Sequence, residues 1–217
     1  MNYSVKEIFY SLQGEGARTG RPAVFCRFTG CNLWSGEERH RSTAECNFCD
    51  TDFVGTDGVG GGKFADAQKL STRLASYWPE RHRGAPYVVF TGGEPLLQLD
   101  RQLIDAMRDQ GFEVAVETNG TLLAPAGIDW LCVSPKGQAG LRQTTGSELK
   151  LVFPQANVNP EDFIGLGFDH FYLQPREEIN RPDEHLSSDN IKQCTVYCLS
   201  HPQWQLSLQT HKFLGIR

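Results

Sequence analysis

Three cysteines in one polar segment, residues 31–51, carry the donor atoms most able to do chemistry in this chain. Fourteen residues separate Cys31 from Cys46, and two separate Cys46 from Cys49. The thiolates of Cys46 and Cys49 can face one metal centre, and Cys31 can join them because the intervening residues are polar, charged and include Gly36. Three thiolates without an obvious fourth ligand indicate an iron–sulfur cluster with one open iron, since a closed site normally shows four ligands.

A structural zinc site is the main alternative for the same segment. His40 lies between the first two cysteines, so Cys31, His40, Cys46 and Cys49 would form a Cys3His tetrahedron. On this segment alone, zinc and a cluster are about equally supported, because both use thiolates at such spacings. A disulfide framework is disfavoured, because the chain has seven cysteines, an odd number, and its first residues carry no secretory signal.

The other four cysteines are predicted to pack in the core. Cys26 and Cys132 lie in apolar segments that we expect to be strands. Cys194 and Cys198 have the spacing of a helical pair, but they share an apolar stripe with Ile191 and Leu199 and have no third ligand near them in sequence.

Composition and charge narrow the class of protein. The 217 residues are 39% hydrophobic and 22% charged, which predicts one α/β domain over residues 1–217 with its own core. A net charge of −5 without a Lys/Arg cluster argues against a nucleic-acid surface. No apolar run is long enough for a membrane helix, so we expect a cytoplasmic protein that acts on a small molecule.

Short apolar strands alternate with helices or other crossovers along the chain. Strands are predicted over residues 21–29, 86–90, 112–116, 129–133, 148–153, 170–173 and 204–208. Asp66 and Asp100 are expected to cap two helices, and a third helix is expected around Ile191. This alternation is typical of a parallel sheet. The chain is short of the ~250 residues of a closed eight-fold barrel, so we predict an open, partial (β/α)6-type barrel.

Polar or glycine-containing motifs follow most of the predicted strands. They are Thr91-Gly92-Gly93-Glu94-Pro95, Glu117-Thr118-Asn119-Gly120, Ser134-Pro135-Lys136, Gln174-Pro175-Arg176 and Gln209-Thr210-His211. The ends of parallel strands share one edge, so these motifs should converge on one site. Arg27, inside an apolar strand, needs an anionic partner, whereas Lys136 and Lys150 are compatible with ordinary surface positions.

The motifs together resemble a known family. The cysteines followed by Thr-Gly-Gly-Glu-Pro resemble radical S-adenosylmethionine enzymes, whose usual spacing, C-x3-C-x2-C, is expanded here by a long insertion. With Ser-Leu-Gln-Gly-Glu-Gly near the start and Gln-Thr-His-Lys near the end, nearly the whole chain is similar to the 7-carboxy-7-deazaguanine synthase family, which includes members with an expanded loop. The resemblance favours the cluster over zinc and makes His40 a loop residue.

The resemblance implies a [4Fe–4S] cluster held by Cys31, Cys46 and Cys49, with S-adenosylmethionine on the open iron as the source of a 5′-deoxyadenosyl radical. In this family Glu117 would accept from the ribose hydroxyls and Phe48 would lie against the adenine. The full set of residues implied to contact S-adenosylmethionine is Phe48, Asp50, Gly92, Gly93, Glu94, Glu117, Ser134, Pro135, Lys136, Gln174, Pro175, Arg176 and Glu177.

The family substrate is 6-carboxy-5,6,7,8-tetrahydropterin, which loses ammonia as its ring contracts to 7-carboxy-7-deazaguanine, a precursor of 7-deazapurines such as queuosine. The implied substrate contacts are Leu12, Gln13, Gly14, Glu15, Arg27, Thr91, His211 and Arg217. Arg217 is included because the family places its C-terminal residue against the pterin. The family also uses Mg2+, for which Thr51 would supply a hydroxyl.

The family further implies an electron donor such as flavodoxin and a homodimer. Two alternatives stay open on the sequence. A radical enzyme that activates a glycine of another protein would share the cluster and the Gly-Gly-Glu-Pro motif, but it gives no role to Gln13, Glu15 or Arg27. A non-enzymatic Cys3His zinc module is the other.

Overall fold

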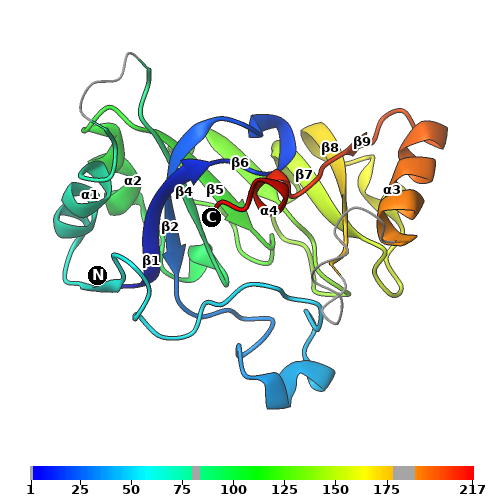
Figure 1. Ribbon diagram of the computed structural model, residues 1–217, viewed down its shortest axis with the longest axis horizontal. Helices are drawn as coiled ribbons and strands as arrows, with labels where there is room; N and C mark the ends of the chain where they lie inside the picture. The colour runs from blue at the N-terminus through cyan, green and yellow to red at the C-terminus, as the bar shows by residue number, and fades with distance from the viewer. Residues whose placement is uncertain (1, 80–83, 178–188) are drawn as a thin grey trace.

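The computed structural model describes residues 2–79, 84–177 and 189–217. In these residues nine strands form one sheet, in the order β3-β1-β2-β4-β5-β6-β7-β8-β9 (Figure 1). The strands are β1 (Tyr3–Leu12), β2 (Pro22–Phe28), β3 (Gly62–Phe64), β4 (Tyr87–Gly92), β5 (Glu113–Thr118), β6 (Trp130–Val133), β7 (Thr145–Phe153), β8 (Gly167–Pro175) and β9 (Gln205–Leu206). No pairing among the described strands joins β3 to β9, so the sheet is open, as predicted.

The sheet is parallel from β2 to β9, and β1 pairs antiparallel with both β2 and β3. The sequence analysis did not predict β1. The pairing register between β1 and β2 shifts between Val5 and Glu7, and the burial pattern of β1 loses strict alternation at that point. A bulge of this kind removes the period of two by which an amphipathic strand is recognised.

Both predicted helix caps are confirmed. The Asp66 carboxylate accepts from the Lys69 amide at 2.8 Å at the start of α1 (Ala67–Ala75). The Asp100 carboxylate accepts from the Leu103 amide at 3.0 Å at the start of α2 (Arg101–Arg108). The other described helices are α3 (Asp189–Ser200), α4 (Thr210–Leu214) and the 3-10 turns η1 (Gly16–Arg18), η2 (Glu38–Thr43), η3 (Pro95–Leu97) and η4 (Pro160–Phe163). None of the described helices is long and apolar enough to cross a membrane.

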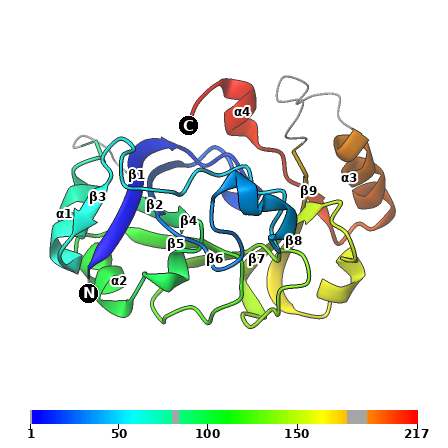
Figure 2. The same cartoon turned by 90° about the horizontal axis from the view of Figure 1, so that it is seen from below.

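Helices α1, α2 and α3 pack against the outer face of the sheet, and the short helix α4 lies over the other, inner face. Figures 1 and 2 place α1 and α2 at one end of the sheet and α3 at the other. Val88 and Phe90 of β4 pack in the same core as Leu70 of α1 and Met107 of α2. Successive residues of a strand point to opposite faces, so Thr91 of β4 points inward. The same alternation puts functional side chains on the inner face of each parallel strand.

The C-terminal segment departs from its prediction. The last strand is only Gln205–Leu206, and the residues after it form α4, because the Thr210 amide leaves the sheet to donate to the Gly14 carbonyl at 2.9 Å. In α3, Cys194 is buried as expected, but Leu199 is 81% exposed. The predicted apolar stripe of α3 is therefore wrong at Leu199.

We predict that Asp100→Ala lowers the free energy of unfolding by about 2–4 kcal/mol. The carboxylate caps α2 and also accepts a hydrogen bond from the hydroxyl of Tyr3, a fully buried residue, at 2.8 Å. The substitution therefore removes the helix cap and leaves the buried Tyr3 hydroxyl without its acceptor. Asp66→Ala is the matched control, because that carboxylate caps an exposed helix end, and it should cost about 1 kcal/mol. Urea unfolding measures both, and equal losses would contradict the role of Asp100 in joining β1 to α2.

Candidate active site

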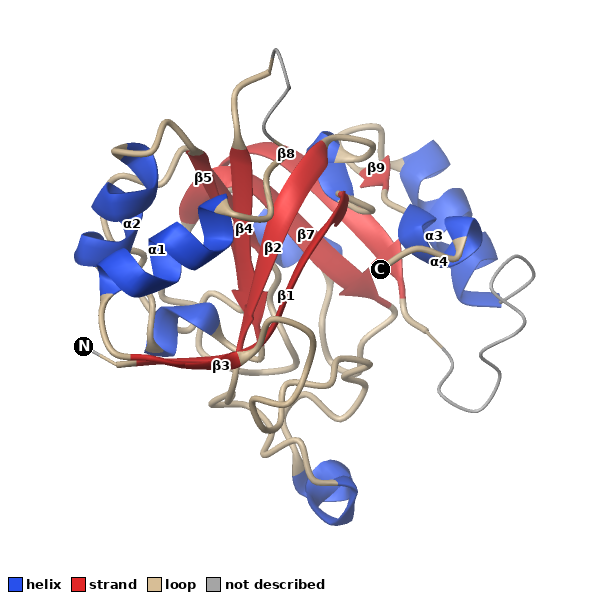
Figure 3. Ribbon diagram, turned by 60° about the vertical axis from the view of Figure 1, so that its left-hand side comes forward, coloured by secondary structure: helices blue, strands red, loops and turns tan. Residues whose placement is uncertain are grey.

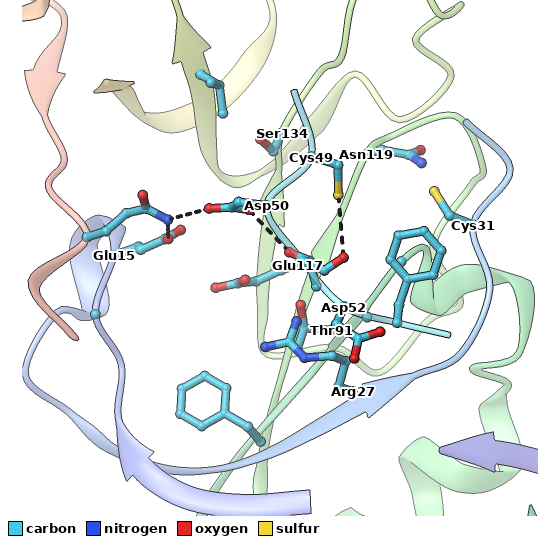
Figure 4. Close-up of a pocket in the computed structure, with 18 of the residues that line it drawn as sticks. Glu15, Arg27, Cys31, Cys49, Asp50, Asp52, Thr91, Glu117, Asn119 and Ser134 are labelled. Atoms are coloured by element: carbon cyan, nitrogen blue, oxygen red, sulfur yellow. Dashed lines mark hydrogen bonds between the residues drawn. The ribbon is translucent and has the colours of Figure 1, made fainter. Parts of the chain in front are cut away.

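A cavity of about 660 Å³ opens where the parallel strands end on the inner face. Its lining includes residues from all five strand-end motifs, from the turn after β1 and from the cysteine segment. Figure 4 shows Glu15, Thr91, Glu117, Ser134 and other lining residues gathered around one space, although they come from distant parts of the chain. The expected convergence of these motifs is therefore present in the structure.

The residues predicted as cofactor, substrate and metal contacts all line this cavity, with two exceptions, Glu94 and Pro135. Pro135 is buried, and its carbonyl accepts from the Gln155 amide nitrogen at 3.3 Å. Glu94 is fully buried behind the lining. Its carboxylate accepts from the Thr118 hydroxyl and from the Asn119 amide, both at 2.8 Å. Burial raises the pKa of Glu94. The side chain of Glu94 thus fixes the turn after β5.

The Gly92-Gly93 turn packs directly against the residue that precedes the first cysteine. The Glu94 amide donates to the Gly30 carbonyl at 2.9 Å. A Cβ atom on Gly93 would lie 2.3 Å from that carbonyl oxygen and 2.7 Å from Cβ of Cys31. Glycine is therefore required at position 93 for the strand-end motif to lie against Cys31.

The three predicted thiols share the cavity, and every cysteine of the described residues is free. The Cys31 sulfur accepts from the Leu33 amide at 3.4 Å, although burial raises the pKa of this thiol. A hydrogen bond from Cys46 lowers the pKa of Cys49 to about 7. Figure 4 shows the sulfurs of Cys31 and Cys49 directed into the same space. A partly ionised thiol beside two others is a donor set suited to iron.

No three His, Cys, Asp or Glu side chains among the described residues are grouped to hold a single metal ion. A tetrahedral zinc site would need such a group, because each thiolate lies about 2.3 Å from the ion. A four-iron cluster binds each thiolate at a different iron and accepts wider separations. His40 is exposed, and its Nδ1 hydrogen-bonds to the Ser35 hydroxyl at 2.9 Å. Within the described part of the chain, His40 is therefore not grouped with the three cysteines.

A buried lysine connects two carboxylates in the floor of the cavity. Lys150 is 4% exposed; its ammonium hydrogen-bonds to the Glu15 carboxylate and lies 3.7 Å from an oxygen of Glu117. Burial opposes the charge on Lys150, but Glu117 and Glu15 hold its pKa well above the ordinary value. Burial likewise opposes the charge on Glu15, but Lys150 keeps its pKa lowered. The reading of Lys150 as an ordinary surface residue is wrong.

The polar side chain of Gln13 links this floor to the turn after β1. Its amide nitrogen donates to Glu117 at 2.9 Å, and its oxygen accepts from the Glu15 amide at 3.2 Å. Glu148 and Lys150 are the two polar residues of the predicted strand 148–153, and their spacing of two places both on the same face. That spacing is the sequence signal that could have identified Lys150 as a site residue.

The anionic partner expected for Arg27 is Glu7. The Arg27 Nε atom donates to Glu7 at 2.9 Å, and the second oxygen of Glu7 accepts from Arg217 at 3.0 Å. The carbonyl oxygen of Arg217 also accepts from the Ser11 hydroxyl at 2.5 Å. Arg217 therefore lies at the cavity beside β1.

Lys212, which was not among the predicted site residues, joins three segments at the mouth of the cavity. Its ammonium contacts Asp50 at 2.8 Å, the Gln209 side-chain oxygen at 3.0 Å and Glu177 at 2.5 Å. Partial burial opposes ionisation of Asp50, but Lys212 holds its pKa well below the usual range. Burial lowers the pKa of the neighbouring His211.

In open, mostly parallel α/β sheets ligands bind outside the carboxyl ends of the strands, which is where this cavity lies. The chain is similar to the crystal structure of QueE from Escherichia coli, with a TM-score of 0.70 and 26% sequence identity over 96% of this chain and 94% of that chain. No family model matches the chain.

Named relatives cover the whole length. The chain is 61% identical over 216 residues to a 7-carboxy-7-deazaguanine synthase of Bordetella pertussis, and 58% identical over 219 residues to one of Caulobacter vibrioides, with 100% of each chain covered in both comparisons. A third relative of that name, from Nitratidesulfovibrio vulgaris, is 54% identical over the full length of both chains. The chain therefore belongs to the 7-carboxy-7-deazaguanine synthase family and is an enzyme.

We predict that Lys150→Met lowers the free energy of unfolding by about 3–5 kcal/mol, because it leaves the carboxylates around it without a counter-charge. Glu15→Gln combined with Lys150→Met should recover part of this loss. Arg101→Met is the control, because it removes an exposed ion pair with Asp105 and should cost at most about 0.5 kcal/mol. Urea unfolding of the ligand-free chain measures all three, and a Lys150→Met loss no larger than the control's would contradict the buried ion pairs.

Proposed function

We propose that this chain converts 6-carboxy-5,6,7,8-tetrahydropterin to 7-carboxy-7-deazaguanine with release of ammonia, as a carbon–nitrogen lyase of 7-deazapurine (queuosine) biosynthesis. We propose a [4Fe–4S] cluster, S-adenosylmethionine and Mg2+ as its cofactors. Membership in the family supports the reaction. The observation that carries the cofactors is that three free thiols and five strand-end motifs line one cavity.

Cys31, Cys46 and Cys49 would hold the cluster, and the polar strand ends would hold S-adenosylmethionine beside it. When bound, these two groups supply a carbon-centred radical that takes a hydrogen atom from the substrate. The chain's own contribution is orientation. Glu117, fixed by Gln13 and Lys150, presents a carboxylate acceptor for the ribose hydroxyls, and Lys136 presents a cation to the methionyl carboxylate.

The opposite side of the cavity suits an anionic pterin. Arg27 offers a guanidinium to a carboxylate, and Glu15, Thr91 and His211 offer acceptors and donors to the ring edge. Phe9 and Phe25, stacked with ring centroids 5.0 Å apart, line the same space and exclude water from it. Thr51 also lines the cavity, where its hydroxyl could join substrate oxygens and waters around Mg2+.

A glycyl-radical activating enzyme is the less favoured function. That function gives no role to Gln13, Glu15 and Arg27, although all three side chains line the cavity. We further propose an electron donor such as flavodoxin, a homodimer, a cytoplasmic location and a free pterin substrate rather than RNA; the net charge of −5 supports the last point.

The central test is anaerobic reconstitution with iron and sulfide, followed by assay for 5′-deoxyadenosine, 7-carboxy-7-deazaguanine and ammonia. Cys31→Ala, Cys46→Ala and Cys49→Ala should each abolish S-adenosylmethionine cleavage, because each removes a cluster ligand. Cys194→Ala is the matched control, because that thiol is buried against the β7–β8 core; it should keep the activity and cost about 1–3 kcal/mol of stability. Stoichiometric zinc without iron would contradict the cluster, and cleavage without the deazaguanine product would contradict the substrate.

The magnesium role is tested separately. Turnover should rise with Mg2+, and Thr51→Ala should weaken that response while the iron content stays unchanged, because the hydroxyl is a metal donor and not a cluster ligand. Thr56→Ala, at a position that does not line the cavity, is the control. An unchanged Mg2+ dependence in Thr51→Ala would remove that residue from the metal site.

A further inference from the structure

Fourteen residues lie between Cys31 and Cys46, and they form a long insertion. Figures 1 and 3 show this segment projecting away from the sheet, with η2 at its far end. Projecting segments of this kind have few contacts to hold a fixed geometry. Cluster ligands nevertheless need a defined arrangement, so something must fasten the insertion to the turn that carries Cys46 and Cys49.

We propose that Arg41, inside the insertion, is the positioning residue that fixes the Cys46–Cys49 turn and sets the reduction potential of the bound cluster. The second half of this inference rests on the proposed function, whereas the first half concerns the chain alone.

The contacts of Arg41 reach across the insertion. One guanidinium nitrogen, Nη1, donates to the Asn47 carbonyl at 3.1 Å and to the Cys49 carbonyl at 2.9 Å. These two carbonyls flank Phe48, so Arg41 holds the two ends of the short segment that follows Cys46. Its Nε atom donates to both oxygens of Glu38, at 2.7 and 2.9 Å. The side chain is only 19% exposed despite its place in a projecting segment.

The guanidinium of Arg41 packs against a buried pair of aromatic rings. Its guanidinium carbon lies 4.2 Å from the centroid of the Trp34 ring, within the range of a cation–π contact. Trp34 is 8% exposed and packs edge-on against Phe53, which is 1% exposed, with ring centroids 5.6 Å apart. The Arg41 guanidinium therefore links Trp34 to the turn that carries Cys46 and Cys49. Planar, multiply donating arginine suits this task better than lysine.

The positive charge of Arg41 should also affect the reduction potential of the bound cluster. Glu38, its carboxylate partner, is 75% exposed and faces water, whereas the Arg41 guanidinium donates to the carbonyls of Asn47 and Cys49. A cation that donates to the backbone beside cluster ligands stabilises the more negative, reduced cluster. Arg41 should therefore make the cluster easier to reduce.

The insertion supplies its own control. Arg39 has the same charge and lies two residues away, but its side chain is 74% exposed and pairs only with Glu37 among the contacts recorded for it. Arg41→Gln and Arg39→Gln thus remove the same charge from the same segment, and only the first removes contacts to the cysteine turn.

The first measurement uses the cluster-free chain. Hydrogen exchange of the amides in residues 46–51 should become about tenfold faster in Arg41→Gln and stay unchanged in Arg39→Gln. Exchange in the core strands reports whether each variant is folded. Equal exchange at residues 46–51 in both variants would overturn the positioning role, whatever the cofactor proves to be.

The second measurement uses the reconstituted protein. Arg41→Gln should shift the oxidised-to-reduced ratio of the cluster about tenfold toward the oxidised form, which is ~59 mV for a one-electron couple, and Arg39→Gln should not. A potentiometric titration followed by electron paramagnetic resonance reads this shift without turnover. A potential that is the same in both variants would overturn the electrostatic role. Failure of the unmodified chain to take up iron would instead contradict the proposed function and leave the exchange result standing.

Discussion

The ion pairs around Lys150 are the constraint on which the site depends. Three carboxylates, those of Glu15, Glu117 and Glu148, lie close enough to this lysine to affect its charge in a region largely closed to water. Carboxylates brought together at such a site repel one another unless a cation is placed among them. Lys150 provides that cation from the middle of β7. Lys150 thereby keeps the pKa of Glu15 lowered, and the carboxylates on the inner face are available as acceptors.

The sheet makes this arrangement possible because its outer face packs against helices and its inner face lines the cavity. The outer face of β4 and β5 is sealed by α1 and α2, so its apolar side chains provide the stability. The inner face carries the cavity, with the short helix α4 at its mouth, and it can hold charged residues. The same parallel strands that form the core thus deliver Arg27, Thr91 and Glu117 to one cavity. Along each of these strands, side chains that pack in the core alternate with side chains that line the cavity.

The edges of the cavity are closed by segments that the parallel pattern does not include. The β1 strand returns antiparallel beside β2 and brings Gln13 and Glu15 to the floor. At the other end of the chain, Lys212 connects Asp50 of the cysteine segment to Glu177 after β8. The Lys212–Asp50 contact joins residues 162 positions apart, so the mouth of the cavity depends on segments that are distant in sequence.

The sequence by itself determined the parallel alternation, both helix caps, the cysteine trio and the strand-end motifs, because each depends on local spacing. Asp66 and Asp100, for example, are recognisable as caps from the residues that follow them. Only the tertiary structure decided the roles of Lys150, Glu94 and Glu7. The spacing of Glu148 and Lys150 places both on one face of the strand, but it does not show whether that face meets solvent or the carboxylates of Glu15 and Glu117, which lie far away in sequence. The β1 strand escaped prediction for a related reason, since its bulge breaks the alternation and only its partners on both sides fix it as a strand.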